Sequence, residues 1–311
     1  MTMPETDTIW LNGEFVPWNE AKVHVLTHGL HYGTGVFEGI RCYDTPRGPA
    51  IFRMPEHLER MHRAARVVRM PMPYSVKELG EVIVRLVRDN HLESCYIRPI
   101  AFRGYGGLGL NTSLIPVDIA IAAWPWGTYL GEDALQRGIR VTISSWRRND
   151  PNVIPPDCKL TGAYITSCVA TVEANDAGFD EALMLDQAGY VAEGTGENIF
   201  LVVDGGLITP PVEGGALPGI TRASILEIAQ DLGIDVVTRN VSRSDLYRAD
   251  EAFCVGTAAE VVPIRSVDGR ELGDPGVITR VVQDRFFSIV RGEDDKYLDW
   301  FTFVHDTATV R

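Results

Sequence analysis

The sequence predicts an α/β or α+β fold with mixed sheets, divided into two domains. The 311 residues are about twice the length of a typical domain, and either half is long enough to bury its own core. Strand-like and helix-like segments alternate only loosely, which favours mixed sheets over a doubly wound fold. Residues 125–138, rich in glycine and proline at their start, are expected to link a small domain, 1–124, to a large one, 139–311.

The first domain is expected to begin with a hairpin over residues 9–16, because apolar strands flank the turn-forming pair Asn12-Gly13. Residues 55–69 predict a helix, since Leu58, Met61, Ala65 and Val68 fall on one side. The next helix should start at Ser75, where Glu78 completes a capping box. Further expected elements are strands at 95–102, 117–124, 139–146, 181–186, 198–203, 234–239 and 252–255, and helices at 163–177, 221–232 and 277–291.

Charge and composition narrow the class of protein. The net charge of −13 repels phosphate backbones and anionic lipids, so nucleic acid and membrane are poor partners. No apolar run approaches a membrane span, and residues 1–8 do not resemble a signal peptide. The five cysteines form no CxxC pair, which argues against a disulfide framework and against a zinc site. We therefore expect a cytoplasmic protein without a metal.

Lysine is scarce, with 4 lysines among the 29 basic residues, so a catalytic lysine can be sought by elimination. Lys77 lies just inside a helix cap, Lys296 in an acidic surface run, and Lys22 near the start of the chain beside Glu20. Lys159 alone stands among small and apolar residues. An amine in such surroundings is more readily deprotonated, which suits Schiff-base chemistry. Taken alone, the pattern more often marks a lysine whose stem packs while its amine reaches water.

Three other motifs predict a flat, phosphorylated ligand. Residues 217–222 place Gly219 and Thr221 at the start of a helix, where free N–H groups and the helix dipole attract a phosphate. Residues 256–259 follow a strand and offer further amides and a hydroxyl. Residues 193–198 put the carboxylate of Glu193 at a strand end, where it could face a pyridine nitrogen. The dinucleotide alternative is weak, because Gly33-x-Gly35 lacks the third glycine.

Seven segments together carry a resemblance to a known family, and they are spread over nearly the whole chain: 22–25, 29–43, 96–99, 123–127, 193–198, 217–222 and 256–260. In these segments the chain resembles the branched-chain aminotransferases, which are fold type IV pyridoxal-phosphate enzymes with two domains.

The resemblance implies that pyridoxal 5'-phosphate is held mainly by the large domain, with Lys159 forming the Schiff base and later carrying the proton. Glu193 would pair with the pyridine nitrogen and Tyr164 with the ring oxygen. Leu217 would support the ring. The phosphate would be held by Arg60, by the backbone of Ile220 and Thr221, and by the hydroxyl of Thr257.

The resemblance also implies the substrate contacts. Phe37, Tyr164 and Trp126 would form apolar walls, Gly39 and Tyr96 would line the same pocket, and the α-carboxylate would sit on Thr257 and Ala258. Tyr32, Leu108 and Leu110 would enter from a neighbouring subunit of a homo-oligomer. Tyr96 and Arg98 are two apart in an expected strand, so they share a face. Arg98 and Tyr32 would then meet the distal carboxylate of glutamate.

We thus expect a transaminase that moves the amino group of Leu, Ile or Val to 2-oxoglutarate in a ping-pong cycle, with side activity on (R)-amines left open. Rivals of the same fold are D-amino-acid transaminase, (R)-amine transaminase and aminodeoxychorismate lyase; the 37–41 and 96–98 segments favour the branched-chain enzyme. Rivals of other classes are a cofactor-binding protein without catalysis and a regulatory protein without cofactor. Thr161, Ala163 and Thr195 depart from the family pattern. The preference among Leu, Ile and Val stays open, as does dimer against hexamer.

Overall fold

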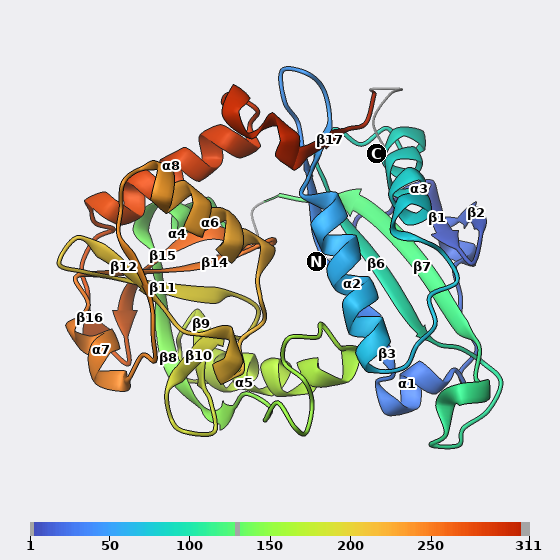
Figure 1. Cartoon of the computed structure of the whole chain (residues 1–311), viewed down its shortest axis with the longest axis horizontal. Helices are drawn as coiled ribbons and strands as arrows, with labels where there is room; N and C mark the ends of the chain where they lie inside the picture. The colour runs from blue at the N-terminus through green and yellow to red at the C-terminus, as the bar shows by residue number, and fades with distance from the viewer. Residues whose placement is uncertain (1–2, 128–130, 306–311) are drawn as a thin grey trace. The chain divides into compact units, whose positions relative to one another are not determined.

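The computed structural model describes residues 3–127 and 131–305, which form two compact units (Figure 1). The first unit contains residues 1–127, 158–162 and 289–311, and the second contains residues 128–157 and 163–288. The expected boundaries placed every residue after 138 in the large domain. Residues 158–162 and 289–311 depart from these boundaries, because each segment pairs with a strand of the first unit. Part of the expected linker, residues 128–130, lies outside the described residues.

The first unit is built on one sheet whose order is β17-β5-β4-β6-β7-β1-β2, with β3 paired to β6. All the pairings found among its described strands are antiparallel. The hairpin turn at Asn12-Gly13 has positive φ at both residues, 49° and 103°, as a type I′ turn requires. The strands are β1 (Thr8–Leu11), β2 (Glu14–Pro17), β3 (Gly35–Phe37), β4 (Ile40–Tyr43), β5 (Ala50–Phe52), β6 (Cys95–Arg103), β7 (Val117–Pro125) and β17 (Phe301–Phe303).

Two amphipathic helices cover this sheet, α2 (Met54–Val67) and α3 (Val76–Asp89) (Figure 1). α3 begins with the expected capping box, in which Ser75 accepts from the backbone of Glu78 and the Glu78 side chain accepts from Ser75. The apolar faces of both helices join the core beneath the sheet. A short helix, α1 (His28–Tyr32), precedes β3. The core therefore fixes α2, which carries Arg60, against the strands that carry Phe37 and Arg98.

The second unit has a mixed sheet of order β10-β9-β8-β15-β14-β11-β12-β13, with β16 paired to β15. β8 runs parallel to both β9 and β15, and β12 runs parallel to β13. The strands are β8 (Ile139–Arg147), β9 (Glu181–Leu185), β10 (Val191–Gly194), β11 (Asn198–Val203), β12 (Gly206–Thr209), β13 (Val236–Thr238), β14 (Glu251–Gly256), β15 (Glu260–Val267) and β16 (Arg270–Glu271).

All five residues of β9 are buried, because packed side chains cover both faces of the strand. Ala182 and Met184 pack with α5 residues Ala170 and Ala174, whereas Leu183 and Leu185 point the other way into the larger core. The helices of this unit are α4 (Glu132–Arg137), α5 (Tyr164–Asp176), α6 (Ile220–Asp231), α7 (Arg243–Arg248) and most of α8 (Val277–Val290). None of the helices in the described parts of the chain is long and apolar enough to cross a membrane.

Several strands were not expected from the sequence. β3, β4 and β5 have three or four residues each, too few for a period to be read. β17 is equally short, and it is fixed by antiparallel pairing with β5, some 250 residues earlier in the chain. β15 was missed although it is longer, because Pro263 interrupts its apolar run.

Candidate active site

The predicted site residues fall into two sets, one in each unit. The first unit holds Tyr32, Phe37, Gly39, Arg60, Tyr96, Arg98, Leu108, Leu110, Trp126 and Lys159; the second holds Tyr164, Glu193, Leu217, Ile220, Thr221, Thr257 and Ala258.

The loop that carries Lys159 is attached to β3. The backbone N–H of Phe37 donates to the carbonyl of Lys159 at 3.1 Å, and Val36 forms an isolated bridge with Leu160. Thr161 Oγ1 donates to the carbonyl of Gly33 at 2.8 Å. Nζ of Lys159 lies 5.1 Å from the centre of the Phe37 ring. The amine of a half-buried lysine is therefore held over an aromatic wall of the predicted substrate pocket.

Arg60 is buried in α2 and makes a bidentate ion pair with the carboxylate of Glu38. Its Nε donates to Oε1 at 2.7 Å and its Nη2 donates to Oε2 at 2.8 Å. His57, one turn earlier on α2, lies 2.8 Å from the same Oε2 through Nδ1. Burial alone would raise the pKa of Glu38, but the charges and hydrogen bonds of Arg60 and His57 hold that pKa well below its usual range. Burial lowers the pKa of His57, so neutral His57 donates its Nδ1 proton to an ionised Glu38.

The other predicted site residues of the first unit include aromatic rings and the guanidinium of Arg98. Arg98 and Tyr96 share a face of β6 as predicted, with Arg98 Nη2 3.5 Å from the Tyr96 hydroxyl. The Arg98 guanidinium also lies 4.9 Å from the Phe37 ring centre, and its Nε is buried without a hydrogen bond among the described residues. Trp126 packs beside Tyr96, with ring centres 5.1 Å apart. A side chain on Gly39 would overlap the Tyr96 hydroxyl, so this position requires glycine.

Tyr32, Leu108 and Leu110 lie on an exposed surface of the first unit. The Tyr32 hydroxyl donates to the carbonyl of Leu108 at 3.2 Å, and Tyr32 remains 48% exposed. Leu110 is 83% exposed. Large apolar side chains this accessible in one small area are typical of an interaction surface.

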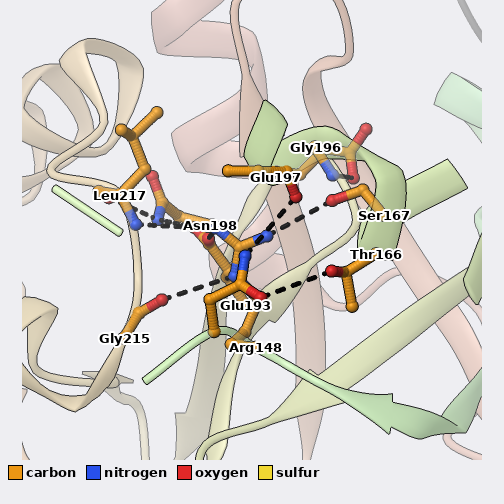
Figure 2. Close-up of polar contacts among 11 residues, drawn as sticks. Arg148, Thr166, Ser167, Glu193, Gly196, Glu197, Asn198, Gly215 and Leu217 are labelled. Atoms are coloured by element: carbon orange, nitrogen blue, oxygen red, sulfur yellow. Dashed lines mark hydrogen bonds and ion pairs between the residues drawn. The ribbon is translucent and has the colours of Figure 1, made fainter. Parts of the chain in front are cut away.

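In the second unit Glu193 accepts from donors on both of its oxygens (Figure 2). Arg148 Nη2 lies 2.7 Å from Oε1, while Asn198 Nδ2 and the backbone N–H of Leu217 each lie 3.0 Å from Oε2. The Glu193 side chain is only 6% exposed. N–H donors on both oxygens favour the ionised carboxylate and fix its orientation. Asn198 also donates to the carbonyl of Leu217 at 2.9 Å, which ties the two predicted ring contacts together.

The start of α6 lacks a side-chain cap. Gly219 is its N-cap residue, and Ile220 and Thr221 form its first turn, with Thr221 buried. A side chain on Gly219 would overlap the amide oxygen of Asn198, which explains the glycine. Backbone N–H groups at such a start can bind an anion. Thr257 and Ala258 lie in the tight turn between β14 and β15, and Tyr164 is the first residue of α5.

Two of the residues that depart from the family pattern make specific hydrogen bonds. Thr161 fixes the lysine loop to Gly33, as described above. Thr195 Oγ1 donates to Glu181 Oε1 at 2.7 Å and accepts from Thr171 at 3.1 Å. Burial raises the pKa of Glu181. Thr195 therefore satisfies a buried carboxyl group that a residue without a hydroxyl would leave with fewer donors.

Sequence reasoning missed Arg148, Glu38 and His57. Arg148 follows a strand as one of two adjacent arginines, a pattern that ordinarily marks a solvated strand end. Glu38 gave a clearer signal, since it is a single acid between Phe37 and Gly39 in an apolar stretch. His57 and Arg60 are three apart on a helix, which places both on one face.

Comparisons with known proteins show the family of the chain. The family described as "Amino-transferase class IV" matches residues 35–267. The chain is 49% identical to the branched-chain-amino-acid aminotransferase of Pseudomonas aeruginosa, over 98% of this chain and all of that protein. It is 48% identical to the Escherichia coli enzyme of the same name, over the same shares. The crystal structure of the Escherichia coli branched-chain amino acid aminotransferase covers 97% of this chain and all of that one, with a TM-score of 0.95. The T.th. branched-chain amino acid aminotransferase complexed with N-(5'-phosphopyridoxyl)-L-glutamate covers the same shares at 45% identity, with a TM-score of 0.94. The chain therefore belongs to the class IV aminotransferases, among the branched-chain-amino-acid aminotransferases.

Proposed function

We propose that the chain transfers the amino group of leucine, isoleucine or valine to 2-oxoglutarate through pyridoxal 5'-phosphate, in a ping-pong cycle. The observation that carries the proposal is the pairing of Arg98 with Phe37 and Tyr96. Aromatic walls beside the Arg98 guanidinium would suit two substrates in turn, an aliphatic side chain and a distal carboxylate.

The residues present fit the cofactor. Glu193 is a buried acceptor oriented by N–H donors, which is what a protonated pyridine nitrogen needs. The uncapped start of α6 and the guanidinium of Arg60 offer donors of the kind that phosphate prefers. The T.th. relative, 45% identical to this chain, forms a complex with a phosphopyridoxyl glutamate. Pyridoxal phosphate, when bound, supplies the electron sink that stabilises negative charge at the substrate α-carbon.

We assign the chemical roles as follows. Lys159 would attach the cofactor and, once released, would take up and give back the α-proton of the substrate on Nζ. Glu193 would keep the ring nitrogen protonated, and Tyr164 would donate to the ring oxygen. Leu217 would support the ring. Arg60, Ile220, Thr221 and Thr257 would hold the phosphate.

Substrate selection rests on the first unit. Phe37, Gly39, Tyr96, Tyr164 and Trp126 would exclude water from an aliphatic side chain, and the turn at Thr257 and Ala258 would accept the α-carboxylate. Arg98 would pair with the distal carboxylate of glutamate. The exposed Tyr32, Leu108 and Leu110 would complete the pocket of a neighbouring subunit, so the active species would be a homo-oligomer.

The test is a panel of amino donors with 2-oxoglutarate as acceptor. L-leucine, L-isoleucine and L-valine should turn over, D-alanine should not, and an (R)-amine in the same panel measures side activity. Varying both substrates should give parallel double-reciprocal lines, as a ping-pong cycle requires. Turnover of D-alanine in preference to all three branched-chain substrates would replace this proposal with the D-amino-acid transaminase.

A further inference from the structure

Arg148 connects three segments of the second unit through its guanidinium (Figure 2). Nη2 lies 2.7 Å from Glu193 Oε1, Nη1 donates to Ser167 Oγ at 3.2 Å, and Nε donates to the carbonyl of Gly215 at 3.4 Å. The backbone of Arg148 is itself fixed, since its N–H donates to the carbonyl of Leu185 at 2.9 Å and its carbonyl accepts from Gln187 at 2.7 Å. Arg148 is therefore a buried residue with every guanidinium nitrogen in use.

One partner of Arg148 is itself a residue that the proposed function assigns to the cofactor ring, and the other two partners lie close to such residues in the chain. Glu193 is contacted directly. Ser167 lies one turn after Tyr164 on α5, and Gly215 lies two residues before Leu217. One side chain thus sets the spacing of the segments that would hold the ring nitrogen, the ring oxygen and the ring face. A rigid outer support of this kind is what holds a catalytic group in its productive geometry.

Arg148 brings Glu193 a positive charge as well as a fixed position. Asn198 and the backbone of Leu217 are neutral donors and reach Oε2, whereas Arg148 brings a positive charge to Oε1. A carboxylate buried without a cation is costly to keep ionised. Only the ionised form can accept a hydrogen bond from a protonated ring nitrogen with the full strength of opposite charges.

We propose that Arg148 is a positioning residue for the cofactor ring nitrogen, acting through Glu193. This inference rests on the proposed function, since it requires Glu193 to meet the nitrogen. The alternative hypothesis is that Arg148 has a structural role only, in which it neutralises a buried acid and stabilises the fold. The two differ in one respect: a positioning role requires a nitrogen in the ring, and a structural role does not.

A cofactor analogue separates them. The affinity of the apo-protein is measured by fluorescence titration for pyridoxal phosphate and for 1-deaza-pyridoxal phosphate, in which C–H replaces the ring nitrogen. Arg148→Gln should weaken pyridoxal phosphate binding about ten- to a hundredfold, as for loss of a charge-assisted contact, and should change analogue binding much less. The matched control is Arg147→Gln, an exposed neighbour whose Nη1 donates to the carbonyl of Gln187. Both affinities should stay at the parent values in this variant. Equal losses for the two ligands in Arg148→Gln would overturn the proposal.

A second variant keeps the test decisive if Arg148→Gln does not fold. Ser167→Ala removes one anchor of the guanidinium and leaves the charge in place. It should reduce the preference for pyridoxal phosphate over the analogue, by less than the change at Arg148 itself. An unchanged preference in Ser167→Ala would then overturn the proposal. Failure of the proposed cofactor site gives a different result, because the parent protein would then bind both ligands equally or neither of them. A wrong assignment of the substrates alone would appear in the panel of amino donors and would leave this titration unchanged.

Discussion

The guanidinium of Arg60 holds the carboxylate of Glu38 at two points, with Nε 2.7 Å from Oε1 and Nη2 2.8 Å from Oε2. Such a fork fixes the plane of the guanidinium and therefore the direction of its remaining N–H groups. We predict that Arg60→Ala loses cofactor about ten- to a hundredfold more readily than the parent, because a charge-assisted phosphate contact is removed. The measurement is cofactor retained after dialysis.

The control for Arg60 lies on the same helix. Arg63 has a side chain that is 56% exposed and pairs only weakly with Glu59, at 3.4 Å. Arg63→Ala should retain cofactor like the parent. Because Arg60 is buried, folding of both variants is checked by circular dichroism first. If folded Arg60→Ala and Arg63→Ala retain cofactor equally, Arg60 does not hold the phosphate.

The pair of His57 and Glu38 predicts a loss of stability in acid. Burial lowers the pKa of His57 below its ordinary 6.5, so the unfolded chain binds a proton there that the folded chain does not. The contribution of neutral His57 to the free energy of unfolding is therefore fully present above pH 6.5. It is lost as the pH falls below 6.5, by at most about 1.4 kcal/mol per pH unit. Glu38 adds a further loss at lower pH, since its folded pKa lies below its unfolded value of 4.5.

His57→Gln tests this prediction. Glutamine can still donate to Glu38 but does not titrate, so urea unfolding should show a flatter loss of stability between pH 6.5 and 5 than the parent does. His91→Gln removes an exposed histidine and is the matched control. A parent-like slope in His57→Gln would show that His57 does not enter the folded state in its neutral form.

Lys159 should be the residue that binds the cofactor covalently. The purified protein should be yellow, and borohydride should fix the cofactor to the peptide that contains Lys159. Mass spectrometry of the reduced, digested protein identifies the labelled lysine among the four in the chain. Label on Lys22 instead would refute the assignment. Lys159→Ala should fold normally, since its loop is held by the backbone and by Thr161, and should be colourless after dialysis.

Much of the fold was predictable because local signals agreed with the final structure. The capping box at Ser75, the turn at Asn12-Gly13 and the glycine after α6, Gly233 with φ 68°, each act within a few residues. β17 and the placement of the Lys159 loop were not predictable, because they depend on pairing with strands far away in the chain. The same holds for the site: Lys159 stands out by its local context, whereas Arg148 gains its role only through Glu193, 45 positions later.

A site completed by a second subunit predicts complementation between two inactive variants. Tyr32→Ala should lose activity because it removes a side chain given to the neighbour, and Lys159→Ala loses it because the cofactor is no longer attached. Unfolded separately and refolded together, the two should form mixed oligomers in which some sites carry both native residues. Activity above that of either variant alone is the expected result. Sites completed within one chain would instead give a mixture as inactive as its components.

The last prediction concerns how one pocket accepts both leucine and glutamate. The Arg98 guanidinium lies 4.9 Å from the Phe37 ring centre and 5.3 Å from that of Tyr96. These rings give the cation favourable contacts when the substrate has no distal charge, and a carboxylate of glutamate adds a stronger one. Arg98 should therefore contribute little to the reaction with leucine and much to the reaction with glutamate.

Arg98→Ala should raise the KM for glutamate and for 2-oxoglutarate about ten- to a hundredfold, because a charge-assisted contact worth about 1.5–3 kcal/mol is lost. The half-reaction with leucine should be nearly unchanged. Single half-reactions, followed by the colour change of the cofactor with each amino acid added separately, measure the two effects independently. Arg98→Lys keeps the charge but not the planar fork, so it should recover part of the glutamate reaction. Equal losses for leucine and glutamate in Arg98→Ala would mean that the guanidinium supports the aromatic walls and that the distal carboxylate is recognised elsewhere.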